Sequence, residues 1–273
     1  MKKRKVKWRN LLVFVISLIL FIALIISIIN IVNWWIDSNN TNDQITKIQD
    51  IVNVNETTDN ENTEIIKQEN IPENSPYWDY IKMNLINVDF NELKTINNQT
   101  VGWIQVNGTN INYPFVQTTD NNYYLTHSFD KSYNSAGWVF LDYRNNLQTL
   151  NKNTIIYAHG RTDKTMFGTL KNILTNNWVN NTDNYIIKLS TENENTLWQI
   201  FSAYHIPTTN DYLKINFNTD ESFMEFTNML KNRSQFNFNT TVNKNDYILT
   251  LSTCYNNSEK MVIHAKLIKK ETR

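Results

Sequence analysis

Cys254 is the only cysteine of the 273-residue chain, and it ends the apolar run "ILTLSTC". A thiolate is a strong nucleophile, and a neighbouring imidazole can act as its base or its charge partner. A single thiol cannot form a disulfide within the chain, so Cys254 is either an inert buried side chain or a group retained for its reactivity. The groups that could activate the thiol decide between these two interpretations.

Four histidines could supply the imidazole. His159 ends the run "TIIYAH" and precedes a glycine, so it lies where a buried strand opens into a loop, as Cys254 does. His205 and His264 lie within predicted strands, where a structural or surface role is expected, and His127 in "YYLTHSF" is intermediate. The pattern favours His159, while spacing by itself leaves its contact with Cys254 open.

The N-terminal residues predict a membrane anchor. Residues 1–10 carry six lysines or arginines and no acid, and we expect them to form a cytoplasmic basic tail. Residues 11–33 are uncharged and mostly apolar, long enough to cross a hydrocarbon core of about 30 Å at about 1.5 Å per residue. The run continues into "NWWID" without a small-residue cleavage site, so we expect a retained, single transmembrane helix with the bulk of the chain outside the cell.

Composition divides the exported part in two. Residues 34–75 are rich in Asn, Thr and acidic residues, so we expect an extracellular linker that buries little surface. Ile45, Ile48 and Val52 within it have the spacing of a short amphipathic helix. Residues 76–273 have the mixed composition of a globular domain and are numerous enough for one core. The formal net charge of zero gives no argument for a nucleic-acid partner.

Short β-branched and aromatic runs between polar breaks predict a mainly β domain, either a barrel or a sandwich. In "VGWIQVNGTNINYPFV", Asn107 and Gly108 separate two such runs and predict a hairpin. Helical spacing is clearest in "DESFMEFTNMLKNRSQF", where Phe223, Phe226 and Leu230 form one apolar stripe. Shorter helical patterns occur in "SPYWDYIKMNLI" and "TMFGTLKNIL".

The segment "TLSTC" at residues 250–254 matches the T-L-x-T-C signature of sortases, the membrane-anchored cysteine transpeptidases of Gram-positive bacteria. The segment "IIYAHG" resembles the strand that carries their histidine. The similarity to class B sortases continues in order through "YWDYIKMNLINVDFNELKTIN", "TVGWIQVNGTNINYPFVQ", "NNYYLTHSFDKSYNSAGWVFLDYRN" and "TMFGTLK" to the C-terminus. The resemblance therefore covers nearly the whole exported domain, and a single cysteine and an N-terminal anchor accompany it.

The resemblance implies a closed eight-stranded β-barrel with N-terminal helices and a helix inserted between the sixth and seventh strands, which "DESFMEFTNMLKNRSQF" would form. It implies that Cys254 attacks the Thr carbonyl of a C-terminal sorting signal and cleaves the Thr–x bond through a thioacyl-enzyme. The acyl group would pass to an amine of the peptidoglycan precursor lipid II, with His159 shuttling protons. The implied partners are surface proteins that carry a sorting signal of the Asn-Pro-x-Thr type, and we expect neither a metal nor an organic cofactor.

Other site residues follow from the resemblance. Sortases have an arginine shortly after the cysteine, whereas the matching residue in "EKMVIHAKL" is Lys260. We expect Lys260 to supply the catalytic positive charge. The alternative is a solvated lysine at the strand end, with the oxyanion stabilised by backbone N–H groups alone or by Arg144 or Arg161 entering from a neighbouring loop. The residues that match the substrate groove of class B sortases are Asn121, Leu125, Thr208, Tyr212, Leu213 and Ser252.

Three other functions remain open. The chain could be a sortase that polymerises pilins, or an inactive anchored binding module that retains the same barrel. It could also be a papain-like hydrolase, but in that group the cysteine precedes the histidine, and here His159 precedes Cys254. Trapping with hydroxylamine and a sorting peptide separates a transpeptidase from the binding module and the hydrolase, because only a transpeptidase gives a hydroxamate at the Thr–x bond that depends on Cys254.

Overall fold

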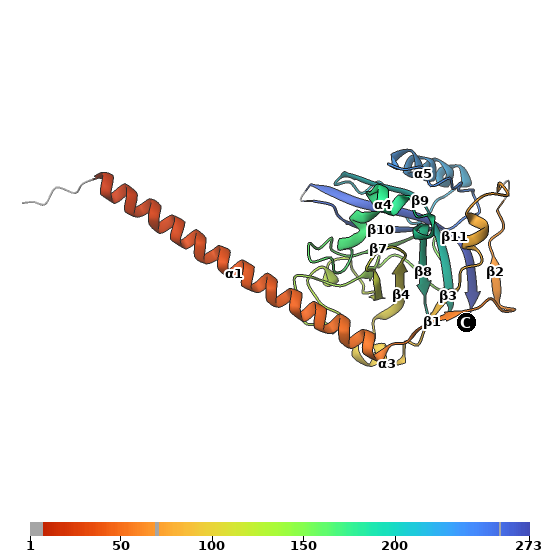
Figure 1. Cartoon of the computed structure of the whole chain (residues 1–273), viewed down its shortest axis with the longest axis horizontal. Helices are drawn as coiled ribbons and strands as arrows, with labels where there is room; N and C mark the ends of the chain where they lie inside the picture. The colour runs from red at the N-terminus through yellow and green to blue at the C-terminus, as the bar shows by residue number, and fades with distance from the viewer. Residues whose placement is uncertain (1–7, 69–70, 257) are drawn as a thin grey trace, which may run out of the picture. The chain divides into compact units, whose positions relative to one another are not determined.

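The computed structural model describes residues 8–68, 71–256 and 258–273. The chain divides into one unit that ends at Asn40 and a second, compact unit from Thr41 to Arg273. Among the described residues, one helix is long and apolar enough to span a membrane, and it begins in the first unit (Figure 1). The α-helices are α1 (Trp8–Ile51), α2 (Tyr77–Tyr80), α3 (Asn91–Ile96), α4 (Asn176–Val179) and α5 (Asp220–Arg233), and the 3-10 helices are η1 (Tyr123–Leu125), η2 (Gly168–Leu174) and η3 (Thr182–Tyr185).

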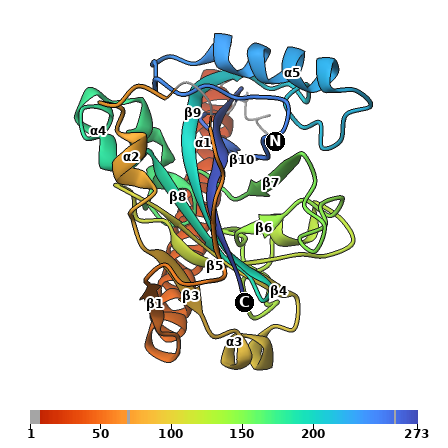
Figure 2. The same ribbon diagram turned by 90° about the vertical axis from the view of Figure 1, so that its right-hand side faces the viewer.

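Eight strands of the second unit form a closed barrel (Figure 2). Their order around the ring is β10-β7-β6-β5-β4-β8-β9-β11, and the ring closes because β10 also pairs with β11. The predicted closed eight-stranded barrel is confirmed. The barrel strands are β4 (Thr100–Val106), β5 (Asn112–Val116), β6 (Phe140–Leu141), β7 (Asn153–Tyr157), β8 (Ile186–Ser190), β9 (Glu194–Pro207), β10 (Ile248–Cys254) and β11 (Glu259–Thr272).

The Asn-Gly hairpin is confirmed, since β4 and β5 pair antiparallel on either side of it. Gly108 has a φ of +67°, a conformation that costs glycine little and most other residues more. A Cβ atom at this position would also lie 2.4 Å from the Asn184 side chain. Both backbone conformation and space therefore require glycine at this turn.

Along the chain, helix α5 follows the sixth barrel strand, β9, and precedes the seventh, β10, as predicted (Figure 1). Thr219 and Ser222 cap its first turn through reciprocal hydrogen bonds, which satisfy backbone N–H groups that have no partner within the helix. Its predicted apolar stripe is buried, and the stripe packs in a cluster separate from the main core of the barrel. That cluster contains Phe201, Tyr204, Tyr212, Phe223, Phe226, Leu230, Ile248 and Val262.

Two of the shorter helical patterns take other forms. In the segment "SPYWDYIKMNLI", helix α2 spans only four residues. The last two residues of this segment instead begin strand β3 (Leu85–Val88). Strand β3 pairs with β1 (Val54–Thr57), so tertiary pairing overrides the local helical spacing. The pattern "TMFGTLKNIL" forms the 3-10 helix η2.

The segment expected to be a linker, residues 34–75, contributes to the second unit from Thr41 onward. The amphipathic pattern around Ile48 is confirmed, because α1 continues to Ile51 and Ile48 is buried. Strand β1 pairs with β3, and β2 (Thr63–Ile65) pairs with the edge of β11. Backbone hydrogen bonds hold these polar strands in place, so the polar composition of the segment did not reveal them.

Candidate active site

Strands β7 and β10 bring Cys254 and His159 to one cleft. The two strands are parallel neighbours, and their register pairs Ser252 with Tyr157. Cys254 and His159 each follow this pair by two residues, the repeat with which side chains return to the same face of a strand. Both side chains line an open cleft of about 470 Å³. The parallel register thus unites two groups that are far apart in the sequence.

Gly160 allows the backbone after His159 to approach the backbone of Cys254. A Cβ atom at position 160 would lie 2.3 Å from the Cys254 carbonyl oxygen and 3.0 Å from the Thr253 hydroxyl. The first distance is shorter than any tolerable contact with a backbone atom, which cannot move aside as a flexible side chain can. The glycine in "YAHG" is therefore a steric requirement of the site.

The ring of His159 is oriented by the carbonyl of Leu125, which lies 2.8 Å from Nε2. A carbonyl oxygen can only accept, so Nε2 carries a proton in this contact. In the neutral ring, Nδ1 is then the nitrogen that can accept a proton. The Leu125 carbonyl thus fixes the orientation of an imidazole that lines the same cleft as Cys254.

Lys260 lies opposite Cys254 on the neighbouring strand β11. Its ammonium Nζ is 3.2 Å from Cys254 Sγ and donates a hydrogen bond to it. The two arginines considered as alternatives are both held in ion pairs with aspartates. Arg144 donates to Asp142 and Arg161 to Asp163, at 2.8 and 2.6 Å respectively.

Five of the six residues predicted to bound the groove line the cleft, and they are Asn121, Leu125, Tyr212, Leu213 and Ser252. Tyr212 is buried, and its hydroxyl lies 3.0 Å from Ser252 Oγ. Burial raises the pKa of Tyr212, so its hydroxyl stays protonated. The sixth residue, Thr208, is outside the cleft lining and donates through its backbone N–H and its hydroxyl to the Ser258 carbonyl.

Six further residues that were not among the predicted site residues line the cleft, and they are Phe140, Tyr157, Ala158, Thr209, Asn210 and Thr253. Five of them could have been found, because they lie within two residues of predicted site residues; these are Tyr157, Ala158, Thr209, Asn210 and Thr253. Phe140 has no such local signal. It enters the site because β6 pairs with β7, which places its ring 5.3 Å from the ring of Tyr157.

His264 and His205 both lie outside the cleft lining. His264 is completely buried between the Thr250 and Tyr204 hydroxyls, at 2.9 and 3.0 Å, and burial lowers its pKa to about 3. His205 Nδ1 lies 2.9 Å from the Glu259 carboxylate, and the His205 ring stacks on the ring of Tyr255. Within the residues that the structure describes, no group of three or more His, Cys, Asp or Glu side chains could hold a metal ion.

Comparisons with known proteins agree with this geometry. Residues 104–268 match the family model of the sortase domain. The chain is 35% identical to sortase B of Staphylococcus aureus over 184 residues, which is 66% of this chain and 75% of that protein. It is 33% identical to sortase B of Listeria monocytogenes over 186 residues, which is 67% of this chain and 75% of that protein.

Solved structures give the same result. The crystal structure of sortase B from B. anthracis in complex with AAEK1 covers 86% of this chain and 99% of its own, with a TM-score of 0.68 and 29% identity. A Staphylococcus aureus sortase B–substrate complex covers 66% of this chain and 84% of its own, with a TM-score of 0.62 and 36% identity. The chain therefore belongs to the sortase family of cysteine transpeptidases and is similar to its class B members.

Proposed function

We propose that this sortase cleaves a C-terminal sorting signal at its Thr–x bond and attaches the protein to the amine of lipid II. Cys254 is the nucleophile, His159 moves the protons, and Lys260 supplies the positive charge. The observation that carries the proposal is the convergence of these three side chains on one cleft, with the Lys260 ammonium 3.2 Å from Cys254 Sγ. The similarity to sortase B supports the reaction class.

In the first half of the reaction, the Cys254 thiolate attacks the Thr carbonyl carbon, and an S–C bond forms. The carbonyl π electrons move to oxygen and produce a tetrahedral oxyanion. When this intermediate collapses, the C–N bond breaks, and the imidazolium of His159 donates its Nδ1 proton to the departing amine. A thioester on Cys254 and a neutral His159 remain.

In the second half, the acceptor amine attacks the thioester while His159 Nδ1 takes its proton, and collapse releases the Cys254 thiolate. The contact between His159 Nε2 and the Leu125 carbonyl supports this role because it keeps Nδ1 as the exchanging nitrogen. Lys260 is close enough to Sγ to stabilise the thiolate before attack and the oxyanion after it. No step requires a cofactor.

The cleft is suited to an extended peptide that combines apolar and amide groups. Aromatic and aliphatic walls from Phe140, Tyr157 and Leu213 lie beside the amides of Asn121 and Asn210. We propose an Asn-Pro-x-Thr signal in preference to Leu-Pro-x-Thr-Gly. The rates at which the enzyme cleaves the members of a peptide library measure this preference directly. Faster cleavage of the Leu-Pro form would reject the proposed Asn-Pro-x-Thr signal.

We further propose that residues 11–33 anchor the enzyme in the membrane, that residues 1–10 lie in the cytoplasm, and that the catalytic unit lies outside. The length and apolar composition of α1 and the six basic residues before residue 11 support this topology. Protease added to intact protoplasts should remove the catalytic unit. Protection of the catalytic unit would reject the orientation.

Hydroxylamine trapping tests the reaction itself. The wild-type enzyme, a sorting peptide and hydroxylamine should yield a Thr hydroxamate, which Cys254→Ala should not form. His159→Ala should lower turnover by several orders of magnitude, whereas His264→Ala should leave the proton shuttle intact. Equal loss in the two histidine variants would contradict the assignment of His159. Absence of hydroxamate from the wild type would support an inactive binding module, and a product joined to a pilin lysine would identify polymerisation.

A further inference from the structure

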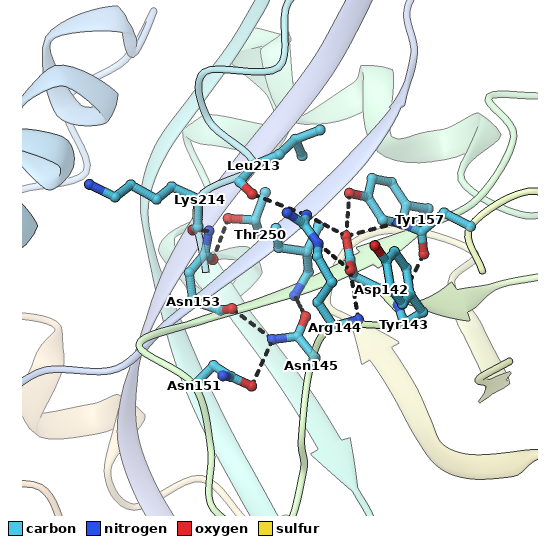
Figure 3. A network of polar contacts seen from close by, with 12 residues as sticks. Asp142, Tyr143, Arg144, Asn145, Asn151, Asn153, Tyr157, Leu213, Lys214 and Thr250 are labelled. Carbon is cyan, nitrogen blue, oxygen red and sulfur yellow. Dashed lines mark hydrogen bonds and ion pairs between the residues drawn. The ribbon is translucent and has the colours of Figure 1, made fainter. Parts of the chain in front are cut away.

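A polar network beside the cleft has no part in the reaction steps above. Its centre is Asp142, whose side chain is completely buried, and Arg144, whose side chain is 42% exposed (Figure 3). We propose that Asp142 and Arg144 are positioning residues that hold two walls of the substrate cleft together and so determine which sorting signal fits. This inference rests on the proposed function, because it concerns how the same cleft selects its peptide.

Several donors surround the carboxylate of Asp142. Arg144 donates to both carboxylate oxygens, from Nε at 2.9 Å and from a terminal nitrogen at 2.8 Å. Its backbone N–H adds a third bond at 3.0 Å. The Asn121 amide and the Tyr157 hydroxyl also donate to this carboxylate, at 3.0 and 2.9 Å. Asn121 and Tyr157 both line the cleft, so one carboxylate holds two of its lining residues.

Arg144 also reaches a second segment of the cleft lining. The terminal nitrogen that bonds Asp142 also donates to the Leu213 carbonyl at 3.1 Å (Figure 3). Leu213 belongs to the loop between β9 and α5, and it lines the cleft as well. A continuous chain of hydrogen bonds therefore runs from Asn121 through Asp142 and Arg144 to Leu213.

The carboxylate at the centre of the network is held in its charged form. Burial by itself raises the pKa of Asp142, but the hydrogen bonds from Arg144 and Tyr157 together outweigh it and hold the pKa below its usual value. The carboxylate is thus ionised, and its donors are held by a charged acceptor, which makes stronger bonds than a neutral one. A planar guanidinium can bond a carboxylate with two nitrogens at once, whereas a lysine in its place cannot.

The same loop offers a matched control. Arg233 of α5 makes a bidentate pair with Asp211, with bonds of 2.9 and 2.6 Å. This pair ties the loop to α5, and neither residue lines the cleft. Arg233→Gln therefore removes an arginine–aspartate pair from the same loop without breaking the link between Asn121 and Leu213.

The kinetic test uses the full chain in detergent with two peptides, one of the Asn-Pro type and one of the Leu-Pro type. Arg144→Gln and Asp142→Asn should raise KM for the preferred peptide about tenfold, the effect of one lost charge-assisted hydrogen bond, and reduce the discrimination between the peptides. The turnover number kcat and the rate of Cys254 alkylation should stay within about threefold of wild type, because the reacting groups are untouched. Arg144→Lys should not restore KM, and Arg233→Gln should leave the discrimination unchanged.

Hydrogen exchange tests without any substrate whether Asp142 and Arg144 hold the cleft together. In Arg144→Gln, backbone amides around Leu213 and around Asn121 should both exchange faster, whereas in Arg233→Gln faster exchange should be confined to the loop and α5. Unchanged exchange around Asn121 in Arg144→Gln, or unchanged KM and discrimination in an active enzyme, would overturn the inference. If the wild-type enzyme is inactive but the variants show the expected exchange pattern, the proposed function is rejected and the positioning role of Asp142 and Arg144 is still supported.

Discussion

The contact between Lys260 and Cys254 gives the sharpest prediction. Replacing Lys260 by alanine removes the ammonium that lies 3.2 Å from Sγ and leaves the strand pairing of β10 with β11 intact, because that pairing uses backbone groups. We expect Lys260→Ala to slow acylation and Lys260→Arg to preserve or raise its rate. A guanidinium retains the charge and adds a planar arrangement of donors.

The magnitude follows from the type of contact. A hydrogen bond that involves a charged group contributes about 1.5–3 kcal/mol, and loss of one donor to a developing oxyanion costs about 3 kcal/mol. A barrier that rises by about 3 kcal/mol slows the reaction by about a hundredfold. Lys260 is half-buried, so water can replace part of the lost interaction, and about a hundredfold is the value to expect rather than a lower bound.

Single-turnover acylation of a fluorogenic sorting peptide measures this effect directly. Alkylation of Cys254 by iodoacetamide at pH 7, measured in parallel, reports on the thiolate without forming an oxyanion. Slower alkylation in Lys260→Ala would assign the charge to the thiolate, and normal alkylation with slow acylation would assign it to the oxyanion. Lys171→Ala is the matched control, because the Lys171 ammonium lies over the nearby Tyr255 ring at 5.7 Å.

Acylation by Lys260→Ala within about threefold of wild type would refute the reasoning. Backbone N–H groups would then have to stabilise the oxyanion without a cation from β11. Arg144 and Arg161 would be the next residues to replace, although each already makes an ion pair with an aspartate.

Two further predictions concern stability. Burial lowers the pKa of His264 to about 3 from an ordinary value of 6.5. Between these two pH values the unfolded chain binds a proton at His264 and the folded chain does not. The stability that neutral His264 contributes is therefore fully present above pH 6.5 and falls as the pH drops towards 3. Urea unfolding at pH 7 and pH 4.5 should show a smaller drop for His264→Gln than for wild type, and equal drops would contradict the burial argument. Asp59→Asn should destabilise the unit from Thr41 onward by about 1–3 kcal/mol, because the fully buried Lys269 ammonium loses its carboxylate partner at 2.5 Å. The control is Glu64→Gln, which should change stability little because Glu64 and Lys270 form a more exposed ion pair. An equally small effect of Asp59→Asn would mean that the segment before residue 76 adds little to the stability of the fold.

Local patterns in the sequence were sufficient wherever neighbouring residues decide the structure. The Asn107-Gly108 turn, the apolar stripe of α5 and the apolar run of α1 depend on residues within a few positions of each other. The ordered series of segments that resemble the family indicated the barrel and the reaction class, since each of these segments is a contiguous run in the sequence. The polar strands β1 and β2 have no such pattern, and the linker prediction for residues 34–75 missed them.

The candidate site could be predicted in part. Cys254 and His159 were recognisable from strand ends and from the resemblance, and Lys260 from its position after the cysteine. Their contacts were not recognisable, because the distance between Lys260 Nζ and Cys254 Sγ depends on the antiparallel register of β10 and β11. Thr208 shows the limit of transferring residues one by one, since its side chain turns to the Ser258 carbonyl.

The sequence by itself determined which residues are chemically able to act and which segments form strands and helices. Tertiary structure decided which of them meet. Asp142 and Leu213 are separated by 71 positions, yet Arg144 joins them because barrel closure brings the loop after β9 beside the end of β6. Such contacts depend on strand order and register, which arise from the packing of the whole barrel core and from backbone pairing between distant segments. No local pattern in the sequence can carry that information.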